Sequence, residues 1–209
     1  MDQNHKYLKK FTTRHGAVIG IGNIETLASF ENATDQDPSK ILSEHRKKQL
    51  QASQNLCRSI VDDSDRILRD ELGKPRLEKT GKHISISHSS TEISLIAGPV
   101  PVAIDIEDQR RQVDKVKSKF TNDDEMKLAE RGFAENPAIF IWSCKECLFK
   151  TLGLSAVHFK ENLQLTEISK SGLIQSTWKV SHPEFEGQYS IDSFIFEHLI
   201  VSYIDSLPR

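Results

Sequence analysis

Six residues starting at Val102 alternate between apolar and other side chains, which predicts a β-strand. Val102, Ile104 and Ile106 would share the face that packs on the core. Asp105 and Glu107 would lie together on the opposite, solvent-facing side, about 6.5–7 Å apart. Two carboxylates at that separation can reach one cation, and Mg²⁺ prefers such hard oxygen ligands. A strand whose outer face simply meets solvent carries the same pattern.

Similar apolar runs bounded by Gly, Pro or polar residues predict strands on both sides of this one. The Gly98-Pro99 turn predicts that the strand before it forms a hairpin with the strand at 102–107. The further predicted strands are 16–22, 66–69, 84–89, 92–97, 163–168, 174–180, 189–196 and 199–204.

Helical spacing of apolar residues predicts three helical regions. The first begins at Asp37-Pro38 and runs to Ile60, and the second, 113–132, divides into two short helices, the latter capped by Thr121 or Asn122. The third, 138–152, follows Asn136-Pro137 and ends at Gly153, where a left-handed cap is expected.

Three chemically distinct residues fall on one stripe of this third helix. Trp142, Glu146 and Lys150 are spaced i, i+4 and i+8, with Lys145 beside them. An aromatic core residue followed by an ordinary surface Glu–Lys pair produces the same pattern, so the stripe alone does not indicate a site.

Each half of the chain combines helices with short antiparallel strands, so we predict an α+β fold. The halves would be residues 1–100 and 101–209. The length of 209 residues suffices for one large core or two small ones.

Charge and composition exclude several classes of function. The 28 Lys and Arg residues against 30 Asp and Glu residues give a net charge of −2, which provides no general attraction for nucleic acid. No apolar run is long enough to span a membrane and the first residues are polar, so we expect a cytoplasmic protein without membrane contact. Cys144 and Cys147 lack the second pair of ligands that a zinc site needs, and we interpret both as small helix residues.

Four short motifs occur in a fixed order along residues 73–153. They are Gly73-Lys74-Pro75, Ser87-His88-Ser89, Ile104-Asp105-Ile106-Glu107 and the segment from Trp142 to Lys150. This order resembles the 4'-phosphopantetheinyl transferases of the large monomeric type, whose marks are GKP, SHS, (G)IDIE and W-x-x-K-E-x-x-x-K. Outside this span, the likeness is one of length and of element order.

The resemblance implies a pseudo-dimer of two similar α+β halves in one chain, expected to be a monomer. Coenzyme A would bind in the cleft between the halves, with Mg²⁺ on its pyrophosphate. The enzyme would transfer the 4'-phosphopantetheine arm to a serine of an acyl or peptidyl carrier protein and release 3',5'-ADP. Metal and lysines suit such phosphoryl-type transfer, in which the protein positions the nucleophile and stabilises phosphate charge.

Roles for individual residues follow from the same resemblance. Asp105, Glu107 and Glu146 would be the metal ligands, and Glu146 is also the natural general base, with Lys150 and Asp105 beside it in the catalytic set. The residues expected to contact coenzyme A are Lys47, Lys74, Pro75, Ser87, His88, Lys145 and Lys150.

Some positions depart from the family pattern. Ala103 stands where a glycine is frequent, and Gln54 or Asn55 stands where the family often has a basic residue for the adenosine 3'-phosphate. The acid that follows Phe120 in the family is either Asp124 or Glu125. The candidate replacements for the basic residue are Arg46, Lys47, Lys48 and Arg58.

Two other functions use the same features. Carboxylates that hold Mg²⁺ could activate water in a phosphoester or nucleotide hydrolase. A non-catalytic module that binds coenzyme A or a carrier protein would need no base at all.

Overall fold

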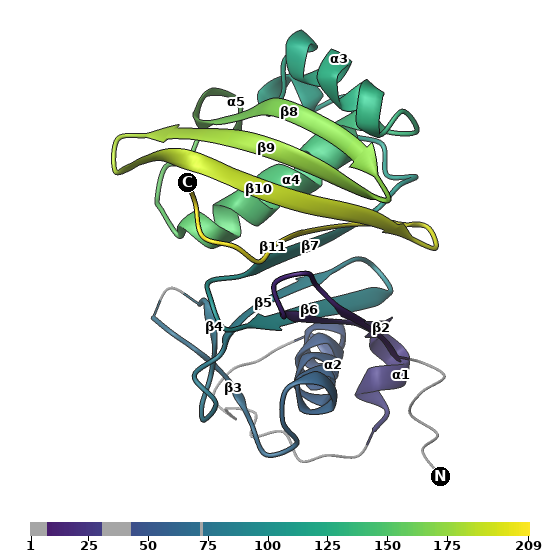
Figure 1. Cartoon of the computed structure of the whole chain (residues 1–209). Helices are drawn as coiled ribbons and strands as arrows, with labels where there is room; N and C mark the ends of the chain where they lie inside the picture. The colour runs from purple at the N-terminus through teal and green to yellow at the C-terminus, as the bar shows by residue number, and fades with distance from the viewer. Residues whose placement is uncertain (1–7, 31–42, 72) are drawn as a thin grey trace. The chain divides into compact units, whose positions relative to one another are not determined.

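The structure is a computed structural model that describes residues 8–30, 43–71 and 73–209. The chain divides into two compact units, Met1–Val100 and Pro101–Arg209, here called unit 1 and unit 2. Both pack helices on antiparallel sheets, so the predicted α+β class is confirmed (Figure 1).

The helices and strands of unit 1 are β1 (Leu8–Thr12), β2 (Val18–Asn23), α1 (Ile24–Ala28), α2 (Glu44–Ile60), β3 (Ile67–Arg69), β4 (Pro75–Leu77), β5 (His83–His88) and β6 (Glu92–Gly98). Four strands form an antiparallel sheet in the order β1-β2-β6-β5, and α2 packs on its two central strands. A Cβ on Gly20 would lie 2.8 Å from Leu56 Cδ1, so only glycine lets α2 approach β2 this closely.

The helices and strands of unit 2 are β7 (Ala103–Asp108), η2 (Lys117–Lys119), α3 (Asp123–Gly132), α4 (Pro137–Leu152), α5 (Phe159–Asn162), β8 (Leu163–Ser171), β9 (Leu173–His182), β10 (Phe185–Phe196) and β11 (Leu199–Ile204). Five strands form an antiparallel sheet in the order β7-β11-β10-β9-β8. α4 crosses this sheet and contacts β7 and β11 (Figure 1).

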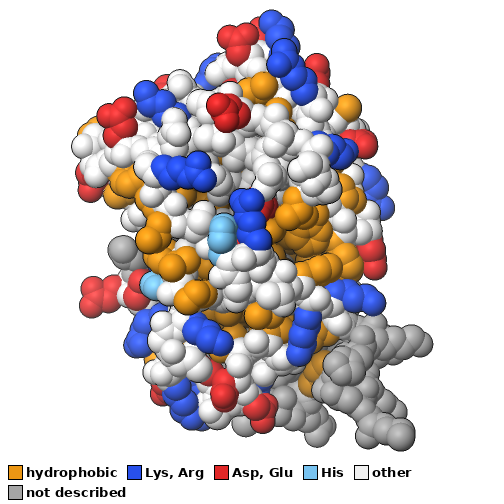
Figure 2. Space-filling model, in the orientation of Figure 1, with side chains coloured by type: hydrophobic (Ala, Val, Ile, Leu, Met, Phe, Trp, Pro, Cys, Tyr) orange, Lys and Arg blue, Asp and Glu red, His pale blue; other side chains and the backbone are white. Residues whose placement is uncertain are grey.

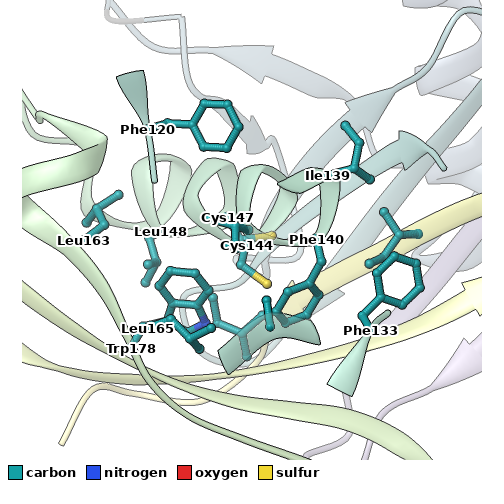
Figure 3. Packing of buried hydrophobic residues seen from close by; sticks show 14 of the residues in the cluster. Phe120, Phe133, Ile139, Phe140, Cys144, Cys147, Leu148, Leu163, Leu165 and Trp178 are labelled. Atoms are coloured by element: carbon teal, nitrogen blue, oxygen red, sulfur yellow. The ribbon is translucent and has the colours of Figure 1, made fainter. Parts of the chain in front are cut away.

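Helix α4 forms where its sequence predicts it. The Asn136 side chain accepts a hydrogen bond from the Ile139 N–H, Pro137 occupies the first turn, and Gly153 ends the helix at φ 62°. Most of its residues are buried, and Figure 3 shows Phe140, Cys144 and Leu148 packed in the same core as Trp178. A helix that is apolar on most sides requires a sheet to cover it, which fixes α4 in the core.

The predicted hairpin between 92–97 and 102–107 is wrong. β6 pairs with β2 on one edge and β5 on the other, so it has no free edge, and β7 instead pairs with β11. The Gly98-Pro99 turn therefore connects β6 to β7 along the chain, but these two strands belong to different sheets and do not pair.

The prediction that the acidic face of β7 meets solvent is wrong for Asp105. Ile104 and Ile106 are buried as predicted, but Asp105 is only 4% exposed because α4 covers its face of the strand. The acidic side chains therefore meet the helix stripe that contains Glu146.

Two helix boundaries also differ from the predictions. The start predicted at Asp37-Pro38 lies outside the described residues, and α2 begins at Glu44, where the Ser43 side chain caps it. Within 113–132, the first predicted helix is only the short turn η2, and the second is α3, with Asn122 as its cap.

The surface carries both signs of charge. On the face shown in Figure 2, Lys and Arg side chains are interspersed with Asp and Glu, as the net charge of −2 leads one to expect. No helix in the described part of the chain is both long and apolar enough to cross a membrane.

Candidate functional site

Strand β7 and helix α4 bring four of the predicted residues together within unit 2. Asp105 and Glu107 lie on the face of β7 that α4 covers, and Glu146 and Lys150 lie one turn apart on α4. Each strand residue contacts the helix: Asp105 bonds to Lys150, and Glu107 bonds to Trp142.

Asp105 and Lys150 form a largely buried ion pair. Lys150 Nζ lies 2.8 Å from Asp105 Oδ1 and also donates to the Ile104 carbonyl at 3.0 Å. Burial is the largest single influence on Lys150 and lowers its pKa, but the charge and hydrogen bond of Asp105, together with the charges of Cys147 and Glu146, raise the pKa overall. Lys150 is therefore a firmly charged ammonium group beside the carboxylates.

Glu107 is held by two donors from different parts of the chain. Trp142 Nε1 donates to Oε1 at 2.8 Å, and Arg111 Nη1 lies 2.7 Å from both carboxylate oxygens. The pKa of Glu107 is nevertheless raised, first by burial and then by the charge of Asp105.

Glu146 is the most perturbed acid of the site. Burial, followed by the charge of Asp105, raises its pKa to about 7, while Lys150 opposes the shift and Glu107 adds to it. A carboxyl group half-ionised at neutral pH can accept a proton and later return it.

The donor set fits a magnesium ion chemically. Three carboxylates face two cations, and Asp105 raises the pKa of both other acids, so the group carries excess negative charge. As the side chains are placed, however, no cluster of three or more His, Cys, Asp or Glu residues in the described ranges could hold a metal ion. In this arrangement Asp105 is paired with Lys150 and Glu107 is paired with Arg111.

Lys145 lies in the core of unit 2. It is fully buried and donates to Glu125 at 2.9–3.0 Å and to the carbonyl groups of Phe120 and Phe159 at 2.7 and 2.9 Å. The structure thus selects Glu125 as the buried acid after Phe120, whereas Asp124 is exposed. These contacts use the ammonium group to join α4 to the segments around Phe120 and Phe159.

The remaining predicted residues belong to unit 1. Lys74 lies in the β3–β4 turn, where its N–H donates to Asp70, and Pro75 starts β4. The other three lie on β5 and α2: Ser87, which is buried, His88, which is exposed, and Lys47, which pairs with Glu44 at 2.7 Å.

Unit 1 also places two arginines within range of each other's charge. Arg69 is exposed, yet partial desolvation and then the charge of Arg46 lower its pKa; its Nη1 donates to the Gly73 carbonyl at 2.7 Å. Arg46 donates to Gln49 at 3.0 Å. Two cations held near one another favour an anion between or beside them.

Sequence reasoning missed Arg111 and Arg69. Arg111 is four residues beyond Glu107, but the turn that brings its side chain back could not be recognised from periodicity. Arg69 lies at the end of a three-residue strand, and nothing local distinguishes it from the exposed arginines around it.

A comparison with protein families identifies the region that holds this site. Residues 101–201 match the model of the 4'-phosphopantetheinyl transferase superfamily. The matched range includes Asp105, Glu107, Glu146 and Lys150, and supports phosphopantetheinyl transfer in general. No curated protein matches the chain.

Proposed function

We propose that this protein transfers the 4'-phosphopantetheine arm of coenzyme A to a serine of an apo acyl or peptidyl carrier protein, as an enzyme of the large monomeric type. The observation that carries the proposal is Glu146, whose pKa of about 7 suits a general base. It lies beside Asp105 and Lys150 in the region that matches the superfamily.

In the proposed reaction, Glu146 accepts the proton of the carrier serine hydroxyl as its oxygen attacks the phosphorus next to the pantetheine arm. The bond from that phosphorus to the bridging oxygen breaks, and 3',5'-ADP leaves with the electron pair. Lys150 remains protonated and offsets charge on the phosphate oxygens. Asp105, Glu107 and Glu146 would hold Mg²⁺, which supplies further positive charge for the pyrophosphate.

Lys145 has a positioning role in this proposal, in place of the phosphate contact that the resemblance implies. Its ammonium group already has four protein oxygens as partners, from Glu125, Phe120 and Phe159. It therefore fixes the segment that bears Phe120, whose ring packs edge-on against Trp142 at 5.1 Å.

Unit 1 would supply contacts to coenzyme A. Lys74, Pro75, Ser87 and His88 remain the proposed contacts to its phosphates, and Lys47 is a proposed contact as well. Among the four candidates for the adenosine 3'-phosphate, Arg46 is favoured because Arg69 adds a second charge near it. The pseudo-dimeric relation of the two halves and the monomeric state belong to the proposal too.

Release of 3',5'-ADP tests the proposal against its alternatives. The protein is incubated with coenzyme A and Mg²⁺, with and without apo carrier protein, and the nucleotide is followed by chromatography. A transferase releases 3',5'-ADP only when carrier is present and stops when the carrier is consumed. Release without carrier would indicate a hydrolase, and no release with any apo carrier would indicate a binding module.

A further inference from the structure

Arg111 has no part in the proposed transfer, yet it binds one of the proposed metal ligands. One nitrogen of its guanidinium group lies 2.7 Å from each oxygen of Glu107. Its Cζ also lies 5.9 Å from the centre of the Trp142 ring, over the same indole that donates to Glu107. A charged donor so placed occupies the lone pairs that a cation would need.

The backbone at Arg111 is held in place, so its return to Glu107 is a feature of the fold. Asp108 accepts from the Arg110 N–H at 2.8 Å, and its carbonyl accepts from the Arg111 N–H at 3.0 Å. Asn136, the cap of α4, donates to the carbonyls of Gln109 and Arg111 at 2.9 and 3.3 Å. The turn after β7 is thereby anchored to α4, so the backbone of Arg111 is held in place independently of its side chain.

The two cations of the site differ in how easily they can leave. The side chain of Lys150 is 26% exposed and has a second acceptor in the Ile104 carbonyl. The side chain of Arg111 is 51% exposed, whereas that of Glu107 is 13% exposed. Because a half-exposed guanidinium group regains hydration when it leaves, separating Arg111 from Glu107 costs less than separating the more buried Lys150 from Asp105. Arg111 is therefore the cation that separates more easily from its carboxylate.

We infer that Arg111 is an internal counter-ion that competes with the divalent cation for Glu107, so that the cation binds as Arg111 leaves the carboxylate. The inference rests on the proposed function only in that Glu107 is a metal ligand. Arg111 stabilises the acidic group before the cation arrives and at the same time weakens binding of that cation.

The test is the affinity of the metal-free full-length protein for Mn²⁺, measured without coenzyme A by electron paramagnetic resonance of the free ion. Arg111→Gln should tighten Mn²⁺ binding about three- to fivefold. This range corresponds to the free energy that a half-exposed ion pair contributes and that the metal must overcome. Arg110→Gln is the matched control. It removes the same charge from the neighbouring residue, but Arg110 pairs with Asp108 and not with Glu107. It should change the affinity less than about twofold.

A double-mutant cycle separates direct competition from a general effect of charge. In a Glu107→Gln background, the carboxylate for which Arg111 competes is absent, so Arg111→Gln should no longer tighten binding. Equal tightening with and without the Glu107 carboxylate would overturn the inference, as would equal effects of Arg110→Gln and Arg111→Gln.

Failure of this inference is distinct from failure of the proposed function. If the wild-type protein binds Mn²⁺ and Arg111→Gln leaves the affinity unchanged or weaker, the inference is wrong while the transferase proposal stands. If the wild-type protein binds no Mn²⁺ and transfers no arm, the proposed metal site and this inference are both overturned. Circular dichroism of each variant confirms that the exposed substitutions leave the fold intact.

Discussion

Glu146 and Lys150 lie one turn apart on α4, but their replacement should reduce turnover for different reasons. Glu146→Gln keeps the shape and removes the base, so we expect turnover to fall by roughly 10²–10⁴. Lys150→Ala removes a preorganised cation, which is worth on the order of 3–4 kcal/mol of the barrier. Turnover at saturating coenzyme A and carrier protein checks both values. Near-normal turnover in two variants that remain folded would make the pair an ordinary salt bridge.

The raised pKa of Glu146 predicts how stability depends on pH when no metal is bound. Between the ordinary value of 4.5 and the folded value of about 7, the folded state binds more protons at this group than the unfolded state does. Its contribution is therefore fully present below pH 4.5 and is lost as pH rises through about 7. Glu146→Gln should flatten this part of the profile.

Chemical denaturation in excess chelator between pH 5 and pH 8 measures that contribution. Wild type and Glu146→Gln are compared at each pH, so that the titration of other groups cancels in the difference. A difference between the two proteins that does not change across this range would show that Glu146 titrates normally.

Arg46 and Arg69 give a prediction that depends on one phosphate of the substrate. If both bind the adenosine 3'-phosphate, Arg46→Gln and Arg69→Gln should each raise the KM for coenzyme A by about ten- to a hundredfold, because a hydrogen bond to a charged group contributes about 1.5–3 kcal/mol. Neither should raise the KM for 3'-dephospho-coenzyme A. Lys48→Gln tests a rival candidate, and it should leave the KM for coenzyme A unchanged because Lys48 pairs with Glu25. Equal increases in KM for both substrates would show that the two arginines do not bind the 3'-phosphate.

At the scale of the element, α4 was predictable and the pairing of β7 was not. Asn136, Pro137 and Gly153 mark the ends of α4 locally, and capping chemistry acts over only a few residues. The alternation along 102–107 identified a strand, but β7 pairs with β11, whose sequence is far away in the chain. Periodicity specifies which residues share a face and carries no information on which strand lies beside them.

Lys145 illustrates the same limit on a helix. The resemblance implies that Lys145 contacts coenzyme A, but α4 is covered on several sides and the side chain is fully buried. Lys145→Met should therefore destabilise unit 2 by about 3–5 kcal/mol, because Glu125 would be left as an unpaired buried charge.

The partner variant shows whether that loss comes from the charge. Lys145→Met combined with Glu125→Gln removes both charges and keeps an oxygen for the Leu165 N–H, which Glu125 accepts at 3.0 Å. Urea denaturation should find the double variant more stable than Lys145→Met alone. If the single variant were as stable as wild type, the pair would contribute nothing to holding α4.

At the scale of the whole molecule, the sequence motifs named three acids and one of the two cations that the structure brings together, but not Arg111. Asp105, Glu107, Glu146 and Lys150 lie beside one another within unit 2, as the motif order led us to expect. Arg111 reaches Glu107 from a turn whose backbone is bound by Asn136. This tertiary contact has no local signature in the sequence. The roles of the unit 1 residues remain predictions, because each role is a contact with coenzyme A, a substrate expected to reach several motifs at once.

The central claim is that this protein attaches a phosphopantetheine arm to a carrier serine. Apo carrier protein is incubated with coenzyme A, Mg²⁺ and either wild type or Glu146→Gln, and its intact mass is measured together with that of a carrier whose acceptor serine is alanine. The account predicts that the wild-type protein adds one phosphopantetheine mass to the carrier, far more slowly with Glu146→Gln, and none to the alanine carrier. An unchanged mass for all the acyl and peptidyl carriers tested, while the protein consumes coenzyme A, would contradict it.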